Sequence, residues 1–180
     1  MLDIVVQAIN QFYRLKNYEE FKALCTKPLD LPEELKNYIA NKGLQLVAEE
    51  DKTYSSRIWT IKFDYYKNEE FEVAHTTKLQ ISKIAPLFLM RHEFVIPSKD
   101  PDTLELELKG WSGEAHNFQQ FYLAEEIVKE LVDKGYKQIH YGEMIEAIEG
   151  FKMPEGQTNL GRNVTVEHLL FMDIFNLLSR

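Results

Sequence analysis

Cysteine, basic charge and long apolar runs are what this sequence largely lacks. Cys25 is the only cysteine in 180 residues, which excludes an internal disulfide and favours a reducing compartment. The first ten residues contain no basic side chain, and Asp3 and Gln7 interrupt their apolar residues, so neither a signal peptide nor a membrane span is expected there. We therefore expect a cytoplasmic protein that does not insert into a membrane.

Basic residues are outnumbered, and the imbalance is confined to one part of the chain. The formal net charge is −8, yet acidic and basic residues are equal in number up to Lys99. A nucleic-acid-binding protein needs a basic surface that displaces counterions from phosphates, and the sequence contains no such cluster. An acidic C-terminal part suits a basic protein partner, which long-range attraction would guide to it. Solubility alone is the alternative explanation for this charge.

Sequence patterns that mark known chemistry are also missing. Ser112 separates a strand-like segment from a helix-like one, but a nucleophile elbow would need glycine at position 114, where the chain has glutamate. The segment 156–163, GQTNLGRN, has arginine and asparagine where a phosphate-binding loop needs lysine and a hydroxyl group. The five histidines form no zinc-binding pair, and there is no second cysteine. We therefore assign no catalytic residue, no metal ligand and no cofactor, and we interpret Cys25 as a small buried hydrophobic residue.

What the sequence does contain is the composition of a globular domain. Hydrophobic residues make up 44% of the chain and charged residues 28%, and this length suits one domain spanning 1–180. Within the first 43 residues, apolar side chains recur at helical spacing and predict three successive helices. Asn17 is the expected N-cap of the second helix, and Gly43 is expected to end the third.

Residues 44–108 are rich in β-branched and aromatic residues and predict five strands. The breaks between successive strands are short and polar, so neighbouring strands are expected to pair antiparallel. Alternation in the second strand predicts one shared face for Trp59, Ile61, Phe63 and Tyr65. Alternation in the fifth strand predicts that Leu104, Leu106 and Leu108 point inward. The same alternation predicts that Glu105 and Glu107 point outward.

The last third of the chain predicts two or three further helices. Ser112 is the expected N-cap of a long helix closed by Gly135, whose buried face would carry Phe121, Ala124, Val128 and Leu131. The segment 141–150 predicts a short helix, and 166–178 predicts a final helix that is apolar on nearly every side. The fold class is therefore α+β: N-terminal helices, an antiparallel meander of about five strands, and C-terminal helices packed on one face.

A non-enzymatic protein-binding module is the function that these features favour. The acidic charge and the size are those of inhibitors that neutralise a basic toxin or nuclease, such as bacterial immunity proteins. Glu143, Glu146 and Glu149 recur every three residues, where like charges repel and add nothing to helix stability, although a solvated face is the alternative. Trp111 is the expected anchor of the interface. The expected acidic rim consists of Glu105, Glu107, Glu114, Glu143, Glu146 and Glu149.

Two other functions stay open at this point. A small-molecule-binding protein or enzyme would have an aromatic-lined pocket on the sheet, with polar groups drawn from His75, His92, Glu93 and Tyr65. A self-associating scaffold would use the apolar segment 166–178 as the interface of a homo-oligomer. A deep pocket with convergent polar groups would favour the first alternative, and a strictly monomeric mass in solution would remove the second.

Overall fold

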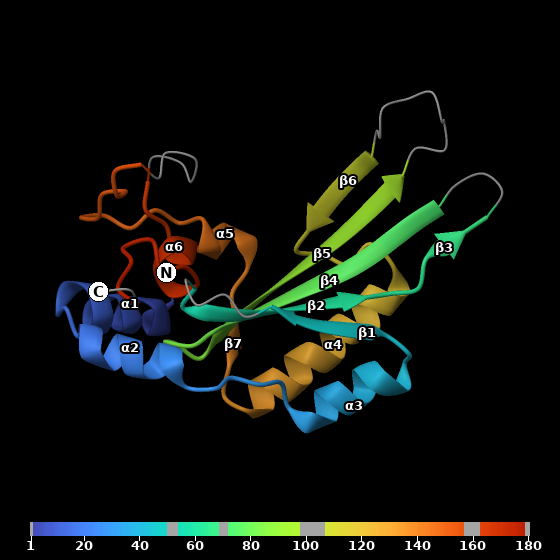
Figure 1. The fold of residues 1–180 in the computed structure, drawn as a ribbon, viewed down its shortest axis with the longest axis horizontal. Coiled ribbons are helices and arrows are strands. Elements are labelled where there is room, and N and C mark those ends of the chain that lie inside the picture. Colours follow the sequence, from blue (N-terminus) through green and yellow to red (C-terminus); the bar gives the residue numbers. More distant parts are fainter. Residues whose placement is uncertain (1, 50–53, 69–71, 98–106, 157–162, 179–180) are drawn as a thin grey trace.

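The α+β architecture predicted from the sequence is confirmed by a computed structural model, which describes residues 2–49, 54–68, 72–97, 107–156 and 163–178 (Figure 1). The helical elements are α1 (Asp3–Ile9), the π-helix η1 (Asn10–Arg14), α2 (Tyr18–Thr26), α3 (Glu33–Asn41), α4 (Phe118–Asp133), α5 (Tyr141–Met144) and α6 (Val166–Leu170). The strands are β1 (Gln45–Glu49), β2 (Ser56–Lys62), β3 (Tyr66–Lys67), β4 (Glu72–Ser82), β5 (Leu87–Pro97), β6 (Glu107–Ser112) and β7 (Lys137–Gln138).

Five of the strands form the expected antiparallel meander, in the order β1-β2-β4-β5-β6. The two-residue strand β3 pairs with the outer end of β4, and β7 pairs in parallel with the start of β5. The parallel pairing of β7 was not predicted, because a two-residue strand leaves no periodic pattern in a sequence. In the described part of the chain, β1 and β6 are the outermost strands of this order.

One face of the sheet is covered by α3 and α4, which lie beneath the strands in Figure 1. Trp59 and Ile61 of β2 are buried there, as predicted, together with Phe63. Tyr65 is 66% exposed instead, because β2 ends at Lys62 and the alternation no longer sets the side of the next residues. The core cluster on this face is Leu31, Leu35, Ile39, Trp59, Ile61, Phe63, Leu79, Ile81, Phe88, Met90, Leu123, Ile127 and Leu131.

A second core cluster lies where the N-terminal helices meet the C-terminal segment. Phe12 and Phe21 pack edge to face, and Phe171 is fully buried in the same cluster. The predicted helix 166–178 is wrong in extent, because α6 ends at Leu170. Beyond it, the carboxylate of Asp173 accepts hydrogen bonds from the backbone N–H groups of Leu177 and Leu178, which holds a non-helical segment in place.

The start of the long helix differs from the prediction. Ser112 is the last residue of β6, and its Oγ accepts a hydrogen bond from the backbone N–H of Glu114. The N-cap of α4 is Asn117, whose side chain accepts a hydrogen bond from the N–H of Gln120 at 2.8 Å. Leu131 is buried as predicted, but Phe121 is 49% exposed rather than in the core; the buried residues of the helix are Gln120, Leu123, Ile127, Glu130 and Leu131.

Two further details of the predicted pattern are corrected. Leu108 is 64% exposed, although it points to the side of the sheet that the leucines were expected to take. Leu104, Glu105 and Leu106 lie outside the described residues. The segment 141–150 forms only the single turn α5, so Glu146 and Glu149 do not share a helix face with Glu143. In the described residues, no helix has the length and apolar character needed to cross a bilayer.

Candidate functional site

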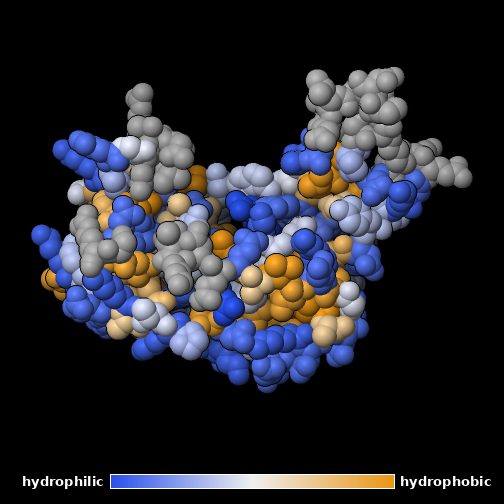
Figure 2. Space-filling view, viewed as in Figure 1, coloured by the Kyte–Doolittle hydropathy of each residue, from blue (hydrophilic) through white to orange (hydrophobic). Residues whose placement is uncertain are grey.

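Among the described residues, helices α5 and α6 lie against the second face of the sheet, called the open face below, only at the end where β4 and β6 finish, and no helix covers the other end of this face (Figure 1). The strand register places four side chains in one row across it, from Glu49 and Ile58 to Gln80 and Leu89. In the next row, Lys78 of β4 stands directly opposite Arg91 of β5. Figure 2 shows hydrophilic residues along the upper side of the molecule and an apolar patch below them, where Figure 1 draws β1.

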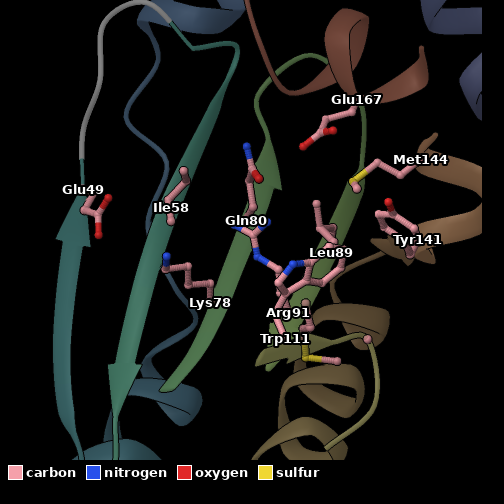
Figure 3. Close-up of a pocket in the computed structure, with 12 residues that line it drawn as sticks. Glu49, Ile58, Lys78, Gln80, Leu89, Arg91, Trp111, Tyr141, Met144 and Glu167 are labelled. Atoms are coloured by element: carbon pink, nitrogen blue, oxygen red, sulfur yellow. The ribbon is translucent and has the colours of Figure 1, made fainter. Parts of the chain in front are cut away.

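A cavity of about 90 Å³ lies where this face meets α5 and α6 (Figure 3). Its floor is formed by the strand residues Ile58, Lys78, Gln80, Leu89 and Arg91, with Glu49 at one end. Its walls are formed by Trp111, Gly113, Tyr141, Met144 and Glu167. Strands and helices that are distant in sequence therefore meet at this one place.

Trp111 is the most prominent side chain of the cavity wall. It is half exposed, and its ring packs edge to face on Tyr141 with 5.0 Å between the ring centroids. The guanidinium of Arg91 lies 5.5 Å from the centre of the indole, within the range of a cation–π interaction. Trp111 is thus held in position on two sides while half of its surface stays exposed.

Lys78 and Arg91 share a single carboxylate. The Oε1 atom of Glu93 lies 3.1 Å from Nζ of Lys78 and 3.2 Å from Nε of Arg91. The Nε of Arg91 is buried and makes no hydrogen bond of good geometry with any described residue. Lys78 and Arg91 carry two positive charges and Glu93 supplies one negative charge, so a local positive charge remains. Like charges at facing positions on neighbouring strands are destabilising.

At the other end of the cavity, Glu167 points from α6 into the space above Gln80 and Leu89 (Figure 3). Its carboxylate forms no ion pair or side-chain hydrogen bond with the rest of the described chain. Glu49 accepts a hydrogen bond from Thr60, and Gln80 donates one to Ser56. The lining of the cavity therefore includes two cationic groups, Lys78 and Arg91, and two carboxylates at opposite ends, Glu49 and Glu167.

Trp111, Glu107 and Glu114, three of the predicted partner-binding residues, come together around β6. Glu107 lies on the same strand face as Trp111, and its carboxylate forms an ion pair with Lys109, which reduces its effect on an incoming charge. Glu114 is exposed and follows Trp111 by three residues. Glu105 lies outside the described residues.

The remaining three predicted glutamates are divided between two places. Glu143 belongs to α5, two residues after Tyr141, and its carboxylate accepts the backbone N–H of His140. Glu146 and Glu149 line a different hollow, beside Val6, Ile9 and Arg14 of the N-terminal helices. Glu114 and Glu143 are therefore the predicted glutamates that lie nearest in sequence to Trp111 and Tyr141.

The polar group suggested for a pocket on the sheet does not converge. His92 is buried beneath α4, with Nδ1 2.9 Å from Oγ1 of Thr77, and burial followed by the nearby His116 lowers the pKa of His92 to about 4. His75 lies on the same helix-covered side, opposite Phe94. Glu93 points to the open face because it follows His92 directly in an extended strand. Tyr65 lies beyond β2 and is exposed, so this set is wrong as a site.

The environment of Cys25 does not favour a reactive thiolate. Cys25 is buried in the second core cluster, and burial raises the pKa of its thiol to about 12 even though Lys83 acts in the opposite direction. The interpretation of Cys25 as a buried hydrophobic residue is confirmed. The described ranges contain no group of three His, Cys, Asp or Glu side chains placed to hold a metal ion.

Sequence reasoning missed Lys78, Arg91, Tyr141 and Glu167. The first two could have been found, because strand alternation already puts Lys78 and Arg91 on the face opposite the core. Tyr141 and Glu167 could not have been found, because only tertiary folding brings α5 and α6 over the strands.

Comparisons with models of known protein families, with curated proteins and with solved structures find no match. The geometry alone therefore guides the functional argument.

Proposed function

We propose that this protein is a non-enzymatic protein-binding module that docks on a basic protein through the end of the open face that carries Trp111. The observation that carries the proposal is the braced, half-exposed indole of Trp111 between Tyr141 and Arg91. Tryptophan and tyrosine provide most of the binding energy in many interfaces, because they bury a large area at a small cost in side-chain entropy. A pre-positioned indole lowers that cost further.

The charge of the molecule supports a basic partner. The net charge is −8, and the excess falls after Lys99, in the part of the chain that contains β6, α4 and α5. Glu114 and Glu143 lie within three residues of the aromatic pair in sequence, and we expect these carboxylates, rather than the part of the indole covered by Arg91, to meet the basic side chains of the partner. An inhibitor or immunity-type protein that neutralises a toxin or nuclease in the cytoplasm is the function of this kind that we favour.

Affinity capture with the full chain tests this proposal. The wild type and Trp111→Ala serve as baits in the native host extract at low and at high salt, with Tyr122→Ala as a matched control because Tyr122 is an exposed aromatic residue of α4. The partner identified by mass spectrometry is then purified and titrated. We expect a basic protein that survives the salt wash, and a loss of about 2 kcal/mol or more for Trp111→Ala only.

The acidic rim has a different expected signature. Glu114→Gln and Glu143→Gln should slow association and make it less dependent on salt, with a smaller effect on dissociation. Equal, small losses for Trp111→Ala and Tyr122→Ala would disprove the anchor, and an acidic partner would disprove the assignment of charge.

A further inference from the structure

A second cavity lies on the helix-covered side of the sheet, between the C-terminal end of α3 and the N-terminal end of α4 (Figure 1). Its floor is formed by Phe63 and Leu123, which are buried in the core cluster beneath α3 and α4. Tyr38 and Leu44 line it from the side of α3, and Tyr122 lines it from α4. The interior of this cavity is therefore apolar and largely aromatic.

The end of α3 positions two of the lining residues. Gly43 has a φ of 69°, a left-handed conformation that commonly ends a helix, and the N–H of Leu44 then donates a hydrogen bond to the carbonyl of Ile39 at 3.1 Å. This turn brings Leu44 back against the core cluster. Lys42, which precedes the turn, stays exposed where it lines the cavity.

Lys42 gives the cavity a positive charge. Its Nζ lies 5.6 Å from the centre of the Tyr38 ring, and it forms no ion pair with a carboxylate of the described residues. Gln119, an exposed residue in the first turn of α4, adds a side-chain amide that can donate a hydrogen bond. A carboxylate bound here would meet one charged donor and one neutral donor.

The surrounding acidic groups leave this preference for an anion in place. Glu126 acts on the cavity wall, because it adds to the effect of burial in raising the pKa of Tyr38. Its carboxylate is already paired with Lys129 at 2.9 Å, which reduces its repulsion of an incoming anion. Among the described residues that line the cavity there is no Asp or Glu, so an amine would meet Lys42 without a compensating carboxylate.

The volume of the cavity sets the size of the apolar part of the ligand. It is about 140 Å³, and an apolar protein cavity of ~150 Å³ binds benzene. We therefore propose that this cavity binds a small monocarboxylate that carries one aromatic ring, with the ring on Phe63 and Leu123 and the carboxylate at Lys42. The inference goes beyond the protein-binding proposal, since no residue of this cavity belongs to the surface around Trp111.

An NMR titration of the full chain with phenylacetate tests the inference, with two analogues. Phenylacetamide keeps the ring without the negative charge, and acetate keeps the carboxylate without the ring. We expect phenylacetate to shift the backbone amide signals of Leu44 and Tyr122 with a dissociation constant of about 1 mM or below. Phenylacetamide should bind about three- to fivefold more weakly, because it loses the ion pair with exposed Lys42, and acetate should leave these signals unmoved.

Three outcomes of the titration would overturn the proposal. Equal affinities for phenylacetate and phenylacetamide would show that Lys42 does not select a carboxylate. Equal shifts with acetate would reveal a simple anion site that makes no use of the apolar interior. No shift at Leu44 or Tyr122 with phenylacetate at about 10 mM would exclude the site itself.

Two pairs of variants assign the contacts. Lys42→Met should lower the affinity for phenylacetate to that for phenylacetamide, whereas Lys134→Met should not, because Lys134 is also the C-cap of a helix but does not line the cavity. Tyr122→Ala should weaken both ring-containing ligands by a similar factor. Phe118→Ala should change neither, because Phe118 is an exposed aromatic residue of the same helix outside the cavity lining. Equal effects of Lys42→Met and Lys134→Met would mean that net charge alone is sensed, which would refute the carboxylate site.

Discussion

Burial on the helix-covered face decides the chemistry of single histidines. His92 is 1% exposed, and its carbonyl oxygen accepts a hydrogen bond from Nε2 of His116 at 3.2 Å. His75 lies close by, and its pKa is also lowered, first by burial and then by His116. Protonation of His92 or His75 in the folded state would place charge beneath α4, so these two rings resist protonation as long as the fold is intact.

Stability should fall in acid partly because of His92. An unfolded histidine takes up a proton near pH 6.5, whereas burial lowers the pKa of the folded His92 to about 4. The contribution of this group is therefore fully present above pH 6.5 and is lost as the pH falls toward 4, by up to about 3 kcal/mol. Urea unfolding at several pH values should show a shallower decline for His92→Gln than for the wild type. Parallel declines would show that His92 does not titrate in this way.

At the scale of elements, the beginning of α4 depends on which of two good capping residues the sheet leaves free. Ser112 and Asn117 are both favoured N-caps, and the sequence alone does not separate them. Pairing of β6 with β5 continues through Ser112, opposite His92, so Ser112 stays extended and the helix starts after Asn117. The apolar stripe of α4 that packs on the sheet includes Leu123, Ile127 and Leu131, and Phe121 lies off this stripe and is exposed.

The stability cost of removing each cap tests this assignment. Asn117→Ala should lower the free energy of unfolding by about 1 kcal/mol, because the N–H of Gln120 loses its acceptor. Asn117→Ser should retain most of the stability, since serine caps equally well. Chemical denaturation of these variants and of Ser112→Ala gives the comparison. A larger loss for Ser112→Ala than for Asn117→Ala would contradict the cap seen here.

The whole molecule has two core clusters. One lies between the sheet and helices α3 and α4, and the other lies between the N-terminal helices and the C-terminal segment. Phe171 is fully buried in one cluster and Trp59 is 1% exposed in the other. Ser82 and Ser56 of the sheet donate hydrogen bonds to the carbonyls of Leu170 and Phe171, so the C-terminal segment is tied to both β4 and β2. The prediction of one domain over 1–180 requires that the two clusters unfold together.

Fluorescence of Trp59 provides that test. In a Trp111→Phe background Trp59 is the only tryptophan of the chain, because the sequence contains two. Phe171→Ala should then destabilise the Trp59 transition by about 3–5 kcal/mol, although the substitution lies in the other cluster. Phe118→Ala is the control, since Phe118 is 79% exposed and should have little effect. A Trp59 transition unmoved by Phe171→Ala would mean two independent units.

The apolar segment 166–178 shows how the whole molecule changed an interpretation made from the sequence. Its apolar side chains were expected at a buried or intersubunit surface, and Val166, Leu169, Leu170, Phe171, Ile174 and Leu177 are all buried within the chain. Self-association through this segment stays a prediction, but its main argument is gone, because the side chains already have partners.

The sequence by itself determined the fold class, the antiparallel meander and most of the core. Trp59 and Ile61 show why: period-two alternation needs only local backbone geometry to separate a buried face from an open one. Only the tertiary structure decided the site. The exposure of Trp111, its contact with Tyr141, and the position of Glu167 in the lining of the same cavity as Lys78 and Arg91 depend on how α5 and α6 return over the sheet. Packing between segments that are far apart in sequence leaves no periodic trace, so this part could not be predicted.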